Sequence, residues 1–150
     1  MFKIDIFTKE EFKDSHGERV LSDILSIGIR DVKKVDYFPF YIIYGDINKS
    51  EAKTIASELL SDKITEGFKI SSGAEKKSKS SIIEVLYKKG VTDTVSESVI
   101  KAIKDLGITN DVKVKTGHKY YLHGNVSQDV LNKIAVKLLA NILVQEYKIK

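Results

Sequence analysis

The sequence contains no cysteine, and only two of its 25 basic residues, Arg19 and Arg30, are arginines. Without cysteine the chain has no disulfide, no thiol nucleophile and no thiolate site for zinc or an iron–sulfur cluster. The shortage of arginine argues against sequence-specific nucleic-acid binding, because the planar guanidinium is the favoured group for contacts with phosphates and base edges.

Long apolar runs are also missing. The longest uncharged apolar stretch, residues 37–45, is far shorter than the roughly 20 residues that cross a membrane. The N-terminus begins with a charged amphipathic segment and not with the apolar core of a signal peptide. With 42% hydrophobic and 31% charged residues among 150, the composition predicts a soluble globular protein without membrane contact, and we expect a cytoplasmic location.

The sequence repeats itself at an offset of 79 residues, where about 18 positions are identical. The identities fall at glycines and apolar positions, for example Gly28 and Gly107, Ile24 and Ile103, and Leu59 and Leu138. A polar segment rich in serine and lysine separates the two copies. We therefore predict two repeats, residues 1–71 and 82–150, joined by a linker at residues 72–81.

Each copy shows the same order of expected elements. In the first copy, apolar alternation predicts a strand at residues 2–6, and the pair Ser15 and Glu18 has the spacing of a capping box that opens a helix. Two extended runs at 32–37 and 40–44 are expected to form a hairpin, followed by a second helix and a short final strand. In the second copy, Thr94 and Glu97 open the helix, and residues 116–118 supply the hairpin turn.

This βαββαβ order predicts an α+β protein made of two ferredoxin-like repeats, in which helices cover one face of each sheet. The other face also needs a cover, because the strand at 40–44 is apolar on both sides. We therefore expect the two repeats to pack sheet to sheet as an intrachain pseudo-dimer. The expected core of this pseudo-dimer is Phe38, Phe40, Ile42 and Tyr44.

Residues for catalysis do not stand out. His16, His118 and His123 have no partner at metal-ligand spacing, so surface positions explain them better than a metal or acid–base site. Residues 14–17 at a helix start could offer backbone N–H groups to an anion, although an ordinary capped terminus explains them as well. Residues 116–121 mix basic and aromatic side chains, which hairpin packing also explains. We expect no catalytic, cofactor-binding or metal-binding residue.

The second copy carries several short motifs in order. Residues 111–118 read Asp-Val-Lys-Val-Lys-Thr-Gly-His, residues 137–141 read Lys-Leu-Leu-Ala-Asn, and Glu146 precedes Tyr147. The first copy supplies a further motif, Asp-Ser-His-Gly, at residues 14–17. Taken together, the chain resembles the PurS family, the small subunit of formylglycinamide ribonucleotide amidotransferase, also called phosphoribosylformylglycinamidine synthase. Each copy keeps motifs that the other lacks, since the second lacks the first motif's glycine and the first lacks the hairpin glycine.

The resemblance implies a PurS-like fold for each repeat and a non-catalytic role in purine biosynthesis. It implies that the chain replaces two PurS subunits and bridges a PurL-like synthetase and a PurQ-like glutaminase. ATP and magnesium would be used by the synthetase, with no cofactor bound by this chain, and further homo-oligomers are possible. The residues that the motifs offer as partner interface are Asp14, Gly17, Gly117, His118, Ala140, Asn141 and Tyr147.

Two other functions stay open from the sequence. Tandem ferredoxin-like units can form a regulatory module that binds a small effector between them. A weak RNA-binding module is suggested by a sequence pI of about 9.0. The resemblance favours the PurS-like function, in which nucleic acid is not a partner.

Overall fold

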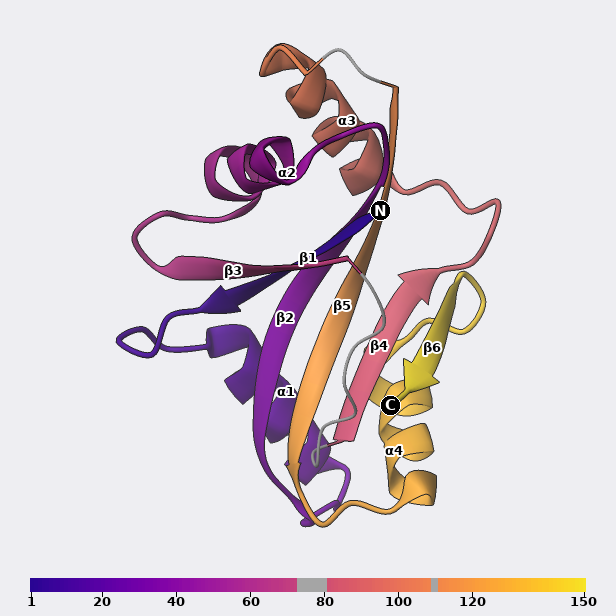
Figure 1. Ribbon diagram of the computed structural model, residues 1–150. Helices are drawn as coiled ribbons and strands as arrows, with labels where there is room; N and C mark the ends of the chain where they lie inside the picture. Colours follow the sequence, from indigo (N-terminus) through magenta and orange to yellow (C-terminus); the bar gives the residue numbers. More distant parts are fainter. Residues whose placement is uncertain (73–80, 109–110) are drawn as a thin grey trace. The chain divides into compact units, whose positions relative to one another are not determined.

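The structure, a computed structural model, describes residues 1–72, 81–108 and 111–150 (Figure 1). The first half contains β1 (Phe2–Thr8), α1 (Ser15–Ser26), β2 (Val32–Gly45), α2 (Lys49–Ile55), the π-helical segment η1 (Ala56–Leu60) and β3 (Glu66–Ser71). The second half contains β4 (Ser81–Tyr87), α3 (Thr94–Asp105), β5 (Val112–Gly124), α4 (Gln128–Ile134), the π-helical segment η2 (Ala135–Leu139) and β6 (Gln145–Ile149). The predicted α+β class is confirmed. In both halves the strands and helices follow the predicted order, except that one long strand stands where two were expected.

The strands form an antiparallel sheet in the order β3-β1-β2-β5-β4-β6. In this order β1 lies between β2 and β3, and β4 lies between β5 and β6 (Figure 1). The prediction that two separate sheets pack face to face is therefore corrected, because β2 and β5 are neighbours in one sheet.

The chain divides into two compact units, and the two repeats at 1–71 and 82–150 stay a prediction. Unit 1 consists of Met1–Phe12, Pro39–Glu75 and Thr92–Thr116, and unit 2 consists of Lys13–Phe38, Lys76–Val91 and Gly117–Lys150. Each unit thus combines both halves of the sequence, since α1 belongs to unit 2 and α3 belongs to unit 1.

The predicted linker, residues 72–81, lies mostly outside the described residues, which leave out 73–80. Its last residue, Ser81, is already the first residue of β4.

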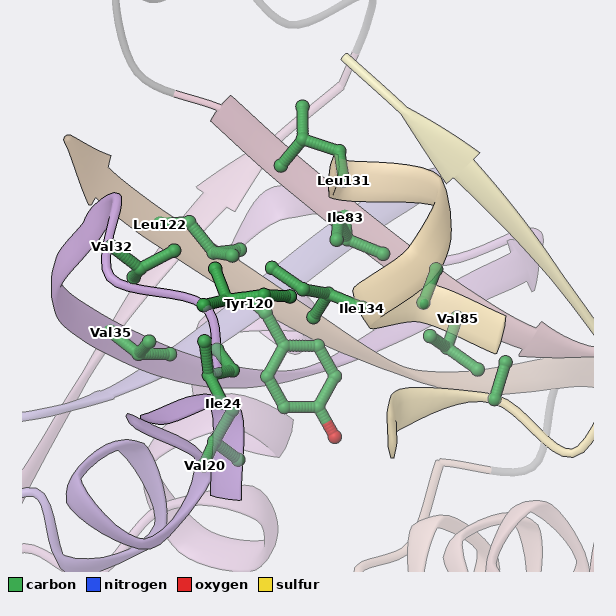
Figure 2. Packing of buried hydrophobic residues seen from close by; sticks show 13 residues of the cluster. Val20, Ile24, Val32, Val35, Ile83, Val85, Tyr120, Leu122, Leu131 and Ile134 are labelled. Atoms are coloured by element: carbon green, nitrogen blue, oxygen red, sulfur yellow. The ribbon is translucent and has the colours of Figure 1, made fainter. Parts of the chain in front are cut away.

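The apolar core of unit 2 explains why α1 belongs there. Val20 and Ile24 of α1 are buried in one cluster with Tyr120 and Leu122 of β5 and with Ile134 of α4. Figure 2 shows side chains of α1 and β2 gathered with those of β4, β5 and α4 in this cluster. The apolar stripe of α1 is therefore buried by β2 and by elements of the second half, and not by β1 or α2 of its own half.

Unit 1 has the complementary arrangement. Val99 and Ile103 of α3 share a buried cluster with Ile4 of β1, Ile43 of β2 and Ile55 of α2. α1 of the first half is therefore buried in unit 2 with β4 and β5 of the second half. Reciprocally, α3 of the second half is buried in unit 1 with β1 and β2 of the first half. We call this the exchange of the two helices. Periodicity identifies which face of a helix is apolar, but it does not state which strands bury that face.

The predicted hairpins are wrong, because β2 and β5 are single long strands. Residues 32–37 and 40–44 belong to one strand that continues through Pro39. In β5, Gly117 pairs with Leu86 and His118 pairs with Val85, so that the expected turn residues are part of the sheet ladder. A two-residue hairpin turn requires positive φ at its centre, and among the described residues with positive φ are Gly45 and Gly124 at the strand ends, but not Gly117.

The helix starts differ by one residue from the prediction. The N-cap of α1 is Asp14 and not Ser15, and the N-cap of α3 is Asp93 and not Thr94. By contrast, α2 has a complete capping box, formed by Asn48 and Glu51. Gly28 and Gly107 follow α1 and α3 with φ of 88° and 89°, the left-handed conformation that glycine commonly adopts after the end of a helix.

Candidate functional site

The residues that the motifs offer as partner interface all fall in unit 2. Asp14 and Gly17 come from the segment Lys13–Phe38, and the other five come from Gly117–Lys150. The sequence predicted them from motifs in different copies, and the exchange of α1 brings those motifs into one compact unit. Their role as partner contacts stays a prediction, and their local geometry separates residues that build the unit from residues that are exposed.

Asp14 ties the start of α1 to β2. One carboxylate oxygen accepts a hydrogen bond from the backbone N–H of Gly17 at 2.8 Å, and the other accepts from the backbone N–H of Tyr37 at 2.9 Å. Asp93 does the same in unit 1, where it accepts from the N–H groups of Ser96 and Thr116. Both aspartates therefore satisfy a free helix N–H and a strand N–H together.

Gly17 lies where α1 closely approaches β2. A Cβ atom built on Gly17 would lie 2.3 Å from the backbone oxygen of Val35, well inside contact distance. In unit 1 the corresponding helix position holds Ser96, whose hydroxyl donates a hydrogen bond to the backbone oxygen of Val114. The glycine thus has a packing reason, and its absence from the second copy is compensated by a serine that bonds to the strand.

An aromatic cluster lies beside this helix start. The rings of His16 and Tyr37 are stacked with centroids 3.6 Å apart, and the centroid of Tyr120 lies 5.3 Å from that of Tyr37. The Tyr37 hydroxyl and Nδ1 of His118 share a hydrogen bond of 2.5 Å. His16 and His118 were expected at the surface, and the structure instead places each of them against Tyr37. The sequence signal for this cluster was weak, because its members lie far apart along the chain. His16 and Tyr120, the first and last of them, are separated by 104 positions.

Burial changes the proton affinities in this cluster. Desolvation raises the pKa of Tyr120 to about 12, although the nearby Arg19 opposes this shift. The Tyr120 hydroxyl therefore stays protonated near neutral pH. Desolvation and the positive charge of Arg19 lower the pKa of His16, and the carboxylate of Asp14 acts in the opposite direction. Both groups are thus held neutral, which suits packing better than acid–base chemistry.

The lowered pKa of His16 predicts that the protein loses stability as the pH falls through 6.5, the ordinary pKa of histidine. Below this pH the unfolded chain binds a proton at this position that the folded chain still excludes, so acidification favours unfolding. In His16→Gln this part of the pH dependence should disappear. Urea unfolding at pH values between about 5 and 8 measures the effect. Identical pH profiles for wild type and variant would contradict the shift.

Ala140, Asn141 and Tyr147 surround the connection from η2 to β6. Ala140 is buried in the core of unit 2, and the hydroxyl of Tyr147 donates a hydrogen bond to the side-chain oxygen of Asn132 on α4 at 2.9 Å. Asn141 is exposed and its side chain accepts a hydrogen bond from the backbone N–H of Leu143 at 3.2 Å. Ala140 and Tyr147 therefore hold the unit together, and Asn141 shapes a turn.

The expected pseudo-dimer core residues lie on the face of β2 opposite Tyr41 and Ile43. Phe40 is fully buried, Phe38 and Ile42 are partly buried, and Tyr44 is 37% exposed. Lysine ammonium groups lie near three of the rings, at 4.6 Å from Phe40 for Lys3, 5.6 Å from Phe38 for Lys119 and 5.9 Å from Tyr44 for Lys115. This face is therefore mixed in character, with cation–π contacts among its apolar side chains.

The described ranges contain no group of three or more His, Asp or Glu side chains placed to hold a metal ion. Within the same ranges, no helix combines the length and the apolar character needed to cross a membrane.

A comparison with known protein families assigns the second half of the chain. The PurS family model, described as phosphoribosylformylglycinamidine (FGAM) synthase, matches residues 80–150. Residues 80–150 are a PurS-family region. No curated protein matches the chain. The PurS match links the second half with FGAM synthase in purine biosynthesis and includes five of the seven predicted interface residues, while Asp14 and Gly17 lie outside it.

The PurS region and the compact units do not coincide. The region includes α3, whose Val99 and Ile103 are buried in unit 1. It does not include α1, whose Val20 and Ile24 complete the core of unit 2. The PurS region in this chain therefore depends on the first half for a buried helix.

Proposed function

We propose that the chain is a non-catalytic, PurS-like subunit of the FGAM synthase complex that bridges a PurL-like synthetase and a PurQ-like glutaminase. The PurS match over residues 80–150 is the observation that carries this proposal. In this function the chain binds no cofactor, ATP and magnesium are bound by the synthetase, and the complex works in the cytoplasm.

We also propose that the first half is a second PurS-like unit, so that one chain takes the place of two subunits. Three features support this proposal. The order of elements is the same in both halves. Asp14 and Asp93 make equivalent bonds to a strand residue 23 positions further on. Finally, α1 and α3 exchange places in a reciprocal way between the two units. A covalent link between two such units keeps each at a high effective concentration for the other.

The test is a reconstitution with the synthetase and glutaminase of the same organism. With glutamine as nitrogen source, FGAM formation is expected only when this chain is present. With ammonia as nitrogen source, the synthetase should work with or without it, which controls for the activity of the synthetase itself. Glutamine-dependent activity that is the same without this chain would refute the proposal.

A further inference from the structure

β6 ends the strand order of the sheet, so one of its two edges has no strand beside it in the described part of the chain (Figure 1). On the other edge, Ile82 of β4 and Lys150 exchange two backbone hydrogen bonds, at 3.2 and 2.9 Å. In an antiparallel pair such residues alternate with residues whose backbone groups point to the opposite edge. The N–H and C=O groups of Tyr147 and Ile149 therefore face outward, away from β4.

The outer edge of β6 is regular enough to accept another strand. Its pairing with β4 runs from residue 145 to residue 149 without a bulge, and none of these residues is proline. The N–H of Gln145 donates to the backbone oxygen of Asn141 at 2.7 Å, while its C=O group points outward like those of Tyr147 and Ile149. A straight, open strand edge of this kind is a template for the addition of a further strand.

Two charged side chains alternate with these outward backbone groups. Glu146 and Lys148 are both exposed, and they lie on the face of β6 opposite Tyr147, which packs against the core of unit 2. A lysine in an edge strand usually discourages pairing with another strand. The glutamate two residues earlier on the same face changes this, because an antiparallel partner with the same sequence can place its glutamate opposite the lysine.

A second copy of β6 can pair with this edge about a two-fold axis at Tyr147. In this register the backbone groups of the two Tyr147 residues bond to each other, and the N–H of each Ile149 donates to the C=O of Gln145 in the other copy. Glu146 of each copy lies opposite Lys148 of the other. A shift of the axis by one residue places two Glu146 or two Lys148 side chains opposite each other, which destabilises a strand pair. The charge pattern thus selects one register.

The edge strand of unit 1 lacks this pattern. β3 has an exposed Lys69 at the position equivalent to Lys148, but Gly67 at the position of Glu146. Pairing of β3 with a second copy of itself therefore offers Lys69 no opposite charge on the same face. Pairing of β3 with β6 of a second copy matches one charge pair only, Lys69 with Glu146. Such a contact is not symmetric and continues into open chains of molecules.

We propose that β6 of a second copy of this chain adds to the outer edge of β6, so that two chains form a symmetric dimer in which Glu146 of each faces Lys148 of the other. The complementary charges and the single register that they select favour a second copy over a strand from another protein. The contact involves a strand of five residues on each side. Because this is a small interface held mainly by backbone hydrogen bonds, the dimer should be reversible and its population should depend on protein concentration.

The experiment measures the dimer dissociation constant of the full chain by sedimentation equilibrium. Glu146→Lys makes both charge pairs repulsive, so it should raise the dissociation constant by about 10-fold or more. Its thermal unfolding should be unchanged, because Glu146 is exposed and faces the apolar Leu86 on β4. Asp105→Lys is the matched control, since it makes the same change of charge at an exposed residue of α3 in unit 1. Its dissociation constant should stay within about threefold of wild type.

A double variant, Glu146→Lys with Lys148→Glu, tests the register. It exchanges the two charges, so that opposite charges again face each other across the two-fold axis. We expect its dissociation constant to return to within about threefold of wild type. The substitution at Lys148 also places a carboxylate opposite Glu84 of β4, which accepts a hydrogen bond from the ammonium of Lys150 at 3.0 Å. Circular dichroism therefore checks that the double variant is folded, and the two single variants decide the contact without it.

A wild type that stays monomeric at every concentration overturns the inference and leaves the proposed function intact. If Glu146→Lys weakens binding of such a monomer to the synthetase or the glutaminase, the edge accepts a strand of that subunit instead. Assemblies larger than a dimer that grow with concentration overturn it in favour of β3 pairing with β6. An unchanged dimer in Glu146→Lys, or equal weakening in Asp105→Lys, also overturns it. A folded double variant that dimerises as weakly as Glu146→Lys overturns the register.

Discussion

A fragment of residues 80–150 is expected to have no cooperative unfolding transition as a monomer, although it contains the whole PurS-family region. The fragment lacks Val20 and Ile24 of α1 and the β2 residues Val32 and Val35, all of which are buried in the core of unit 2. Each such side chain contributes about 1.5–3 kcal/mol when it is buried. Their combined loss is comparable with the total stability of about 5–15 kcal/mol of an ordinary domain.

Two measurements test this expectation. Urea unfolding followed by circular dichroism should show a cooperative transition for the full chain and none for the dilute fragment. Addition of a second fragment, residues 1–72, should restore the transition, because it supplies α1 and β2. A dimer that forms at high fragment concentration would agree with the structure if a second copy provides the missing helix. A stable monomeric fragment at micromolar concentration would contradict the assignment of α1 to unit 2.

Replacement of Ile24 by alanine is expected to destabilise unit 2 by about 2–5 kcal/mol, the usual range for a buried isoleucine. Ile24 lies on α1 in the first half of the sequence and is fully buried in the core of unit 2, most of whose other residues come from the second half. The loss should therefore appear in the second half. Hydrogen exchange is expected to show weaker protection of the backbone amides of β4 and β5, with protection of β1 and β3 unchanged.

Ser22→Ala is the matched control for this substitution, because Ser22 is exposed on the same helix. It should change the free energy of unfolding by less than about 0.5 kcal/mol. If Ile24→Ala instead weakened the protection of β1 and β3, α1 would pack on its own half, and the exchange of helices would be wrong.

The local features of this protein were predictable because they depend on neighbouring residues. The helix-ending glycines, the capping box of Asn48 and Glu51 and the apolar helix stripes follow from backbone conformation and periodicity within a few positions. Even here the tertiary structure changed details. Asp14 and Asp93 replaced the predicted caps because their carboxylates bind a strand N–H as well as a helix N–H.

The sequence alone was enough to place the helices and the outer strands, to show the similarity of the two halves and to indicate the resemblance of the second half to PurS. The tertiary structure decided that β2 and β5 run straight through the expected turns, and that α1 and α3 exchange places. It also decided that Leu143 points outward while Ala140 is buried. The physical reason is that an apolar stripe gains nearly the same free energy from any complementary surface. Periodicity shows that a helix must be buried, and only the folded chain shows against which strands.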